Sequence, residues 1–154
     1  MSIKLNLRDG EFPFTHVSHT RIVVRGIVLN DENKVAVCVV NRDDIFGKCN
    51  YIETPGGGKE ENESLEEGLI RELDEELGYK VEVIDKVGII EDYYNLINRK
   101  NINHYYLCRI KDKTKVLMIG DRFHDIEGAK KNGIKSLGQH KVQIFNIILR
   151  EVLH

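Results

Sequence analysis

The chain has 154 residues, and its 23 Lys and Arg residues nearly balance 25 Asp and Glu residues, which gives a formal net charge of −2. With 41% hydrophobic and 31% charged residues it has the composition of an ordinary globular protein, and its length predicts a single domain over residues 1–154. This balance excludes a general nucleic-acid binder, which carries a strong basic excess, and no apolar run approaches the roughly 18 residues of a membrane-spanning helix.

The first ten residues alternate between apolar and polar side chains and lack the continuous apolar core of a secretory signal. The three cysteines, Cys38, Cys49 and Cys108, are widely spaced and form no CxxC pair. Such cysteines are typical of free thiols in a reducing compartment, so we expect a cytoplasmic protein without a membrane partner.

The first third of the chain predicts strands. Residues 21–29 are rich in β-branched side chains, and with residues 34–40 they predict a hairpin around a polar turn. Residues 41–50 are polar and predict a loop. A short strand at 51–53 then ends at Pro55 and three glycines, because proline lacks a backbone donor and glycine admits positive φ.

Residues 64–77 predict one helix, which begins at Ser64 and ends at Gly78. Its expected core stripe consists of Leu65, Leu69, Ile70, Leu73 and Leu77. The segments that follow predict strands at 79–90, 104–110, 115–120 and 134–137, a polar loop at 95–103, a short helix at 126–132 and an amphipathic helix at 141–154. Because strands and helices alternate, the predicted class is α/β.

The segment 57–79 is strongly acidic, with nine acidic residues against two basic ones. On a helix of about 100° per residue, Glu72, Glu75 and Glu76 share one face at the edge of the apolar stripe, so we expect them to be partly buried. Clustered carboxylates of this kind need a divalent cation, and oxygen ligands suit Mg²⁺ or Mn²⁺. Gly68 lies one turn before Glu72 and leaves space beside these carboxylates.

The same segment resembles the Nudix box of the Nudix hydrolases. The match consists of Gly57, five residues, Glu63, seven residues, Arg71-Glu72-Leu73, one residue, Glu75-Glu76, one residue and Gly78-Tyr79. Tyr79 stands where the family more often has an aliphatic residue. The resemblance covers residues 20–110 and implies an α/β/α sandwich with a mixed sheet.

The resemblance also implies a function. It makes the Gly57 carbonyl, Glu72, Glu75 and Glu76 the ligands of Mg²⁺ or Mn²⁺, with Glu72 as the base or water-orienting group, held by Arg71, and Glu63 as a brace for the loop. The catalytic set would be Arg71, Glu72, Glu75 and Glu76. The implied reaction is hydrolysis of a nucleoside diphosphate linked to another group, so the partner would be a small nucleotide; whether the chain forms a homodimer is left open.

Substrate contacts are predicted more broadly. Arg71 can contact phosphate, and it can pair with Glu67 and Glu75 one turn away. Tyr93 and Tyr94 follow the box and could stack on a base, although tandem tyrosines are also ordinary core residues of strands.

Residues 115–138 resemble a different motif, GDxxxD of haloacid-dehalogenase-like phosphatases, through Asp121 and Asp125. The nucleophile motif of that family, DxDx[TV], does not occur in the chain, so a phosphatase lacks its covalent mechanism. We therefore expect 111–138 to be an atypical strand–helix–strand fragment. It either completes the sandwich ahead of the last helix or packs separately or between two chains.

Two functions follow from these patterns. The first is a Mg²⁺-dependent Nudix pyrophosphohydrolase. The alternative is a catalytically silent Nudix module that binds a nucleotide and regulates a partner. The intact carboxylate set favours the enzyme, and the unusual C-terminal third favours the silent module.

Overall fold

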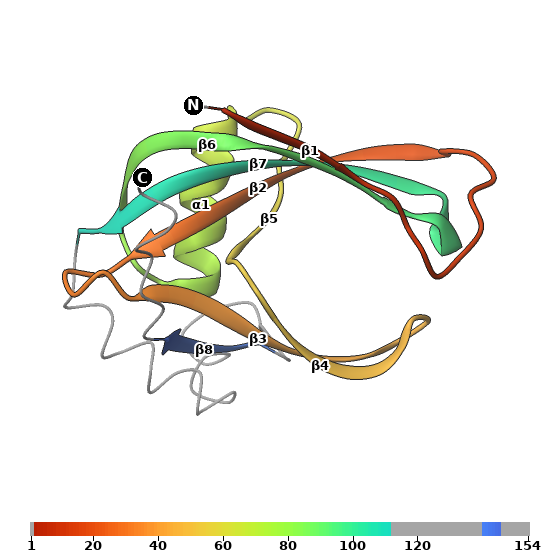
Figure 1. Cartoon of the computed structure of the whole chain (residues 1–154). Coiled ribbons are helices and arrows are strands. Elements are labelled where there is room, and N and C mark those ends of the chain that lie inside the picture. Colours follow the sequence, from red (N-terminus) through yellow and green to blue (C-terminus); the bar gives the residue numbers. More distant parts are fainter. Residues whose placement is uncertain (1, 112–139, 146–154) are drawn as a thin grey trace.

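The computed structural model of the chain describes residues 2–111 and 140–145 (Figure 1). Within these ranges it contains one α-helix and a mixed sheet with the strand order β1-β6-β7-β2-β3-β4, while β5 pairs with β2 and β8 with β3. The elements are β1 (Ile3–Leu7), β2 (His19–Leu29), β3 (Val35–Asp44), β4 (Gly47–Glu53), β5 (Gly56–Gly58), α1 (Leu65–Leu77), β6 (Val81–Tyr94), η1 (Asn95–Ile97), β7 (Arg99–Ile110) and β8 (His140–Phe145).

The two longest pairings form the centre of the described sheet. Strands β2 and β7 run parallel along the whole of β2, and β6 and β7 run antiparallel. On its other edge β2 pairs with β5, and among the described residues it pairs with β3 only at Val28 and Leu29. The β3–β4 hairpin therefore diverges from β2, as Figure 1 shows. This divergence makes room for the candidate site.

Helix α1 forms as the sequence predicts, because both of its ends are specified locally. The Ser64 side chain accepts a hydrogen bond from the Glu67 amide, the Glu67 carboxylate accepts one from the Ser64 amide, and Gly78 closes the helix in the left-handed region at φ 63°. The helix packs against the even-numbered residues of β2 and β7. Its fully buried residues are Leu69, Leu73 and Leu77.

Burial of each of these leucines contributes about 1.5–3 kcal/mol to the stability of the folded chain.

Ile70, expected in the core stripe, is instead 47% exposed. It lies at the far edge of the stripe, about 140° from Leu65 on the helical wheel. Tyr79, the departure from the Nudix box, is 5% exposed and packs in the same core. It fills the apolar position that the motif assigns to an aliphatic residue.

Two predicted loops are wrong. Strands β3 and β4 occupy most of 41–50, with a tight turn between Asp44 and Gly47, and η1 and β7 occupy most of 95–103. Two of the polar side chains of β7 find partners on β6, because the Asn101 amide donates to Asp92 at 2.8 Å and the Asn103 amide donates to Asp92 at 3.1 Å. Pairing across the sheet thus overrides the weak local preference of polar residues for loops.

The predicted helix at 141–154 is also wrong in its first part. Residues 140–145 form β8, which pairs antiparallel with β3 from Val35 to Val40. The β-branched residues Val142 and Ile144 suit a strand, and the edge of β3 offers backbone partners. The other elements predicted after residue 111, together with Asp121, Asp125 and residues 146–154, lie outside the described residues. No helix in the described part of the chain has the length and apolar character needed to cross a membrane.

Candidate functional site

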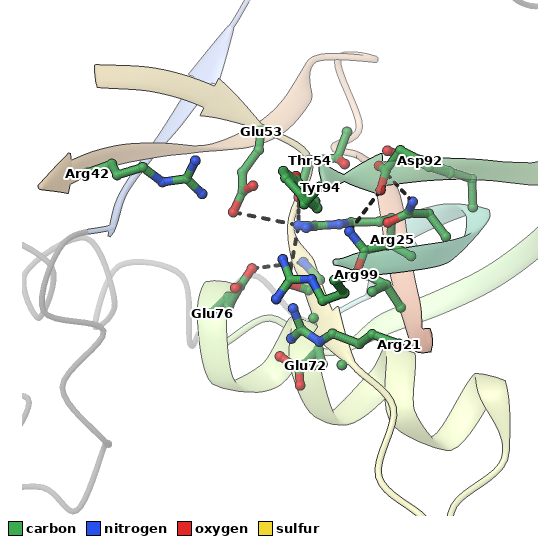
Figure 2. A pocket seen from close by; sticks show the side chains of 17 residues that line it. Arg21, Arg25, Arg42, Glu53, Thr54, Glu72, Glu76, Asp92, Tyr94 and Arg99 are labelled. Carbon is green, nitrogen blue, oxygen red and sulfur yellow. Dashed lines mark hydrogen bonds and ion pairs between the residues drawn. The ribbon is translucent and has the colours of Figure 1, made fainter. Parts of the chain in front are cut away.

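A cleft of about 680 Å³ opens where the β3–β4 hairpin leaves β2. Its floor is the odd-numbered face of β2 and β7, the face opposite α1 at these positions. One end is closed by the glycines of β5 and by Glu72 and Glu76 of α1 (Figure 2). The cleft therefore joins the acidic helix to a polar sheet surface.

The glycine loop contacts both carboxylates through its backbone. The Gly56 amide donates to Glu76 Oε2 at 2.8 Å, and Gly56 has φ +143°, where a Cβ would overlap the carbonyl oxygen of Val24. At Gly57 a Cβ would lie 2.5 Å from Glu72 Oε2. The backbone contact excludes a side chain at Gly56, and a Cβ at Gly57 would displace the Glu72 carboxylate, so glycine lets the backbone lie close to both carboxylates.

Glu76 is held in a buried environment and is 7% exposed. Besides the Gly56 amide, it accepts a hydrogen bond from the Cys38 thiol at 3.5 Å. Burial, together with the charge of the Glu76 carboxylate, raises the pKa of Cys38 far above its ordinary value. Cys38 therefore stays protonated and remains a donor.

Arg71 links the loop to the helix. Its Nε and Nη2 atoms donate to the Glu63 carboxylate at 3.0 and 2.7 Å, and Nη1 donates to Glu72 at 2.8 Å. Nη2 also donates to the Gly58 carbonyl at 3.1 Å. The hydrogen bonds from Arg71, supported by the Glu60 amide, lower the pKa of Glu63 to about 2. Glu63 is therefore ionised at neutral pH and braces the loop.

The structure brings together only part of the predicted site. Glu72, with 15% of its side chain exposed, and Glu76 line the cleft, whereas Glu75 is 52% exposed and outside it. Glu75 is reached by Arg71 Nη1 at 3.4 Å. Glu67, the other expected partner of Arg71, instead forms the cap with Ser64. The expected partial burial of Glu75 is therefore wrong.

The two tyrosines lie on opposite faces of β6, because successive strand residues point in opposite directions. Tyr94 lines the cleft. Tyr93 is not among its lining residues and packs edge-on against Phe14, with the Arg8 guanidinium 4.7 Å from its ring centroid. Of the three predicted substrate contacts, only Tyr94 lines the cleft, and Tyr93 and Arg71 do not.

The donor chemistry fits a hard cation even though the carboxylates do not converge. A carboxylate oxygen of Glu76 accepts a hydrogen bond from the Gly56 amide. The Glu72 carboxylate occupies the space that a Cβ would fill at Gly57. Among the described residues, however, no three His, Cys, Asp or Glu side chains come close enough together to hold a metal ion. Arg71 occupies the position between Glu72 and Glu75.

Sequence reasoning missed the polar wall of the cleft. Polar and charged side chains form this wall. They are Arg21, Arg25, Arg42, Arg99, Asp92, Asn101, Asn103 and Tyr105. The sequence pattern that could reveal this wall is the two-residue period of a strand. It places Arg21 and Arg25 on one face of β2, and the odd-numbered residues of β7 lie on the same face of the sheet. The period is obscured where β7 begins, because the polar residues at 95–103 predict a loop.

A family model described as the NUDIX domain matches residues 19–137, a range that includes most of the segment resembling the phosphatase motif. Nudix hydrolase 6 of Arabidopsis thaliana is 29% identical over 99 residues, which cover 64% of this chain and 34% of that protein. This chain thus spans little more than a third of that relative's length.

Two solved structures share the fold. A NUDIX hydrolase from Nitrosomonas europaea has a TM-score of 0.53 and 17% identity, and the match covers 61% of each chain. A MutT protein from Methanosarcina mazei Go1 has a TM-score of 0.50 and 22% identity, with 60% of this chain and 66% of that chain covered. These likenesses confirm the expected α/β fold with a mixed sheet.

Proposed function

Since the chain belongs to the NUDIX domain family, we propose that it is a hydrolase that cleaves the pyrophosphate linkage of a nucleoside diphosphate joined to another group, with the help of Mg²⁺ or Mn²⁺. The observation that carries this proposal is the contact of Glu72 and Glu76 with the glycine loop at one end of the cleft. The Arabidopsis relative, named a Nudix hydrolase, supports it. A small nucleotide partner and a cytoplasmic location stay predictions.

The residues that would hold the cation are the Gly57 carbonyl, Glu72, Glu75 and Glu76. All four would coordinate the cation through an oxygen atom, the ligand type that Mg²⁺ and Mn²⁺ prefer. A bound cation supplies neutralisation of the pyrophosphate charge and lowers the pKa of a water molecule bound beside it.

The chain's own residues position the reacting groups. Arg71 holds Glu72 through Oε1 at 2.8 Å, which leaves Oε2 at the Gly57 backbone to accept the proton of the attacking water. As oxygen of the water bonds to phosphorus, the anhydride P–O bond breaks and the leaving group departs with the electron pair. Glu76 is fixed by the Gly56 amide, and Glu63 fixes Arg71. Tyr94 provides an aromatic face for the base.

The alternative, a silent module that binds a nucleotide and regulates a partner, has one observation in its favour. In the described ranges the side chains of the box do not converge on a metal position, and Arg71 neutralises Glu72 instead. Such an arrangement could bind a nucleotide in the cleft without hydrolysing it.

A substrate panel separates the two functions. Purified protein is incubated with ADP-ribose, dinucleoside polyphosphates, oxidised deoxynucleoside triphosphates, ordinary nucleoside triphosphates and nucleotide sugars, with Mg²⁺ or with EDTA, and products are resolved by anion-exchange chromatography. The hydrolase proposal expects turnover of at least one compound with Mg²⁺ and none with EDTA. Binding of nucleotides without turnover of any compound would establish the silent module instead.

A further inference from the structure

Arg21 of β2 and Arg99 of β7 lie side by side on the cleft floor. The parallel register places His19 opposite Arg99 and Arg21 opposite Asn101, so the two arginines are offset by two residues on neighbouring strands and point to the same face. Figure 2 shows their guanidinium groups next to one another, with Glu72 beyond Arg21. Both residues line the cleft.

These two like charges have few partners of their own. Within the described part of the chain, neither guanidinium takes part in a hydrogen bond or an ion pair. The Arg99 guanidinium carbon lies 4.9 Å from the centroid of the Tyr94 ring. Arg21 is attracted electrostatically to the Glu72 carboxylate, which is already hydrogen-bonded to Arg71. Burial, followed by repulsion from Arg99 and Arg25, lowers the pKa of Arg21. The pair therefore has the electrostatic character of an anion-binding site.

The neighbouring Asn101 adds an independent observation. Asn101 is 4% exposed and lines the cleft, its amide donates to Asp92, and its Oδ1 atom is buried without a hydrogen-bond partner among the described residues. Arg99 Nε is buried and unpartnered in the same way. Buried polar atoms are normally satisfied, so an unpartnered acceptor and an unpartnered donor two residues apart on one face of β7 indicate a polar ligand at this place.

Arg25 and Arg42 differ from this pair. Arg25 donates to the Thr54 carbonyl at 2.9 Å and lies 3.6 Å from Glu53, so it fastens β2 to the segment before β5. Arg42 forms an ion pair with Asp44 at 3.1 Å. Arg21 and Arg99 are the two guanidiniums on the cleft floor whose hydrogen-bonding capacity is left for a ligand by the described residues.

We propose that Arg21 and Arg99 together bind a phosphate group of the substrate that lies beyond the Glu72 carboxylate, so that the preferred substrate is a nucleoside polyphosphate rather than a nucleoside diphosphate joined to an uncharged sugar. This inference rests on the proposed function and specifies its substrate class. Two guanidinium groups match the charge of a phosphate, and each can donate more than one hydrogen bond to its oxygens. Asn101 Oδ1 accepts a hydrogen bond from a neighbouring hydroxyl of the substrate.

The first test uses binding alone. Inorganic tripolyphosphate is titrated by calorimetry into the full chain in EDTA, with wild type, Arg21→Gln, Arg99→Gln, the double variant and Arg8→Gln, which removes the same charge at an exposed position outside the cleft. We expect each single cleft variant to raise the Kd about tenfold or more, as for loss of a charge-assisted hydrogen bond, and Arg8→Gln to leave it unchanged. The Kd of the double variant should rise by less than the product of the two single fold-changes, because both residues hold one phosphate group.

Unchanged binding in both Arg21→Gln and Arg99→Gln, or an equal loss in Arg8→Gln, would overturn the inference. Folding is checked by thermal melting. Because the two guanidiniums repel each other, Arg21→Gln should keep or raise the Tm, whereas a purely structural role predicts a lower Tm. Arg99→Lys keeps the charge but removes the buried Nε–H, and we expect its Kd to lie between those of wild type and Arg99→Gln.

The second test uses turnover. The hydrolysis of a nucleoside triphosphate is compared with that of the hexose derivative of the same nucleoside diphosphate, both with Mg²⁺. We expect wild type to have a higher kcat/KM for the triphosphate. In Arg21→Gln and Arg99→Gln we expect this preference to be smaller, mainly because the KM for the triphosphate rises. Hydrolysis of the hexose derivative at an equal or higher kcat/KM would overturn this inference and leave the hydrolase proposal standing. Tripolyphosphate binding through both arginines without turnover of any compound would support the phosphate site and refute the hydrolase.

Discussion

Arg71 and Glu63 form a bidentate ion pair, with Nε 3.0 Å from Oε2 and Nη2 2.7 Å from Oε1. The pair joins the segment after the glycine loop to the middle of α1. Because Arg71 also holds Glu72 through Nη1, the position of Glu72 depends on Glu63. Glu63 and Arg71 thus position Glu72, a proposed ligand of the cation.

This pair makes the stability of the protein sensitive to acid. The pKa of Glu63 is about 2 in the folded chain, below its ordinary value of 4.5, so its contribution is fully present above pH 4.5 and disappears as the pH falls toward 2. We expect the difference in urea midpoint between wild type and Glu63→Gln to shrink across this range. Glu61→Gln, at an exposed position, is the control. A constant difference from pH 6 to pH 2 would contradict the assignment.

Gly68 provides the space that the Glu63 carboxylate occupies. A Cβ at position 68 would lie 2.7 Å from Glu63 Oε1, and that oxygen is held by Arg71 and by the Glu60 amide. Alanine is favoured over glycine inside a helix by about 1 kcal/mol, but we expect Gly68→Ala not to gain this stability and to lower hydrolysis at least tenfold.

Urea denaturation and initial rates check this prediction. Gly10→Ala is the control, because a Cβ there meets nothing within 4 Å. If Gly68→Ala were more stable than wild type by the full helix preference and equally active, the position of Glu63 would not depend on the missing side chain.

Glu75 tests whether the Nudix assignment holds for an exposed carboxylate. Its side chain is 52% exposed, so Glu75→Gln should fold normally by circular dichroism. If Glu75 is a metal ligand, the substitution lowers kcat by orders of magnitude. Asp74→Asn changes the same charge at the next residue, which is also exposed, and should leave the rate unchanged. Equal rates for wild type and Glu75→Gln would refute the ligand assignment.

The three thiols should differ sharply in reactivity. Cys49 is exposed, whereas Cys38 and Cys108 are fully buried. Burial raises the pKa of Cys108 to about 12, and that of Cys38 is raised as well. Because the thiolate is the reactive form, a chromogenic disulfide reagent at pH 8 should modify one thiol per chain quickly in the native protein, and all three in denaturant. Cys49→Ser should abolish the fast phase, and a second fast thiol would contradict the described core.

The part of the fold that could be predicted from sequence is the part with local signals. Helix α1 has its cap at Ser64, its stop at Gly78 and its leucines at helical spacing, so its bounds follow from neighbouring residues. Strand β7 begins with polar residues whose partners are on β6, and these partners are not visible in a local window. The strand at 140–145 likewise depends on the edge of β3.

The same distinction applies to the site. The glycine loop, Arg71 and the carboxylates lie within one segment of sequence, so their association could be predicted from spacing. Arg21 and Arg99 are far apart in sequence and meet only through the parallel pairing of β2 and β7. Tyr93 and Tyr94 could not be distinguished until the direction of each side chain on β6 was known.

The most direct test of the metal site is the affinity for Mn²⁺, measured by calorimetry on wild type, Glu72→Gln, Glu75→Gln, Glu76→Gln and Asp74→Asn. If these carboxylates hold the cation, wild type and Asp74→Asn bind Mn²⁺ with the same Kd, and the three glutamate variants each bind at least about tenfold more weakly, as loss of a charged ligand predicts. Equal Mn²⁺ affinity in all five proteins, or no binding by wild type, would contradict a metal site built on α1.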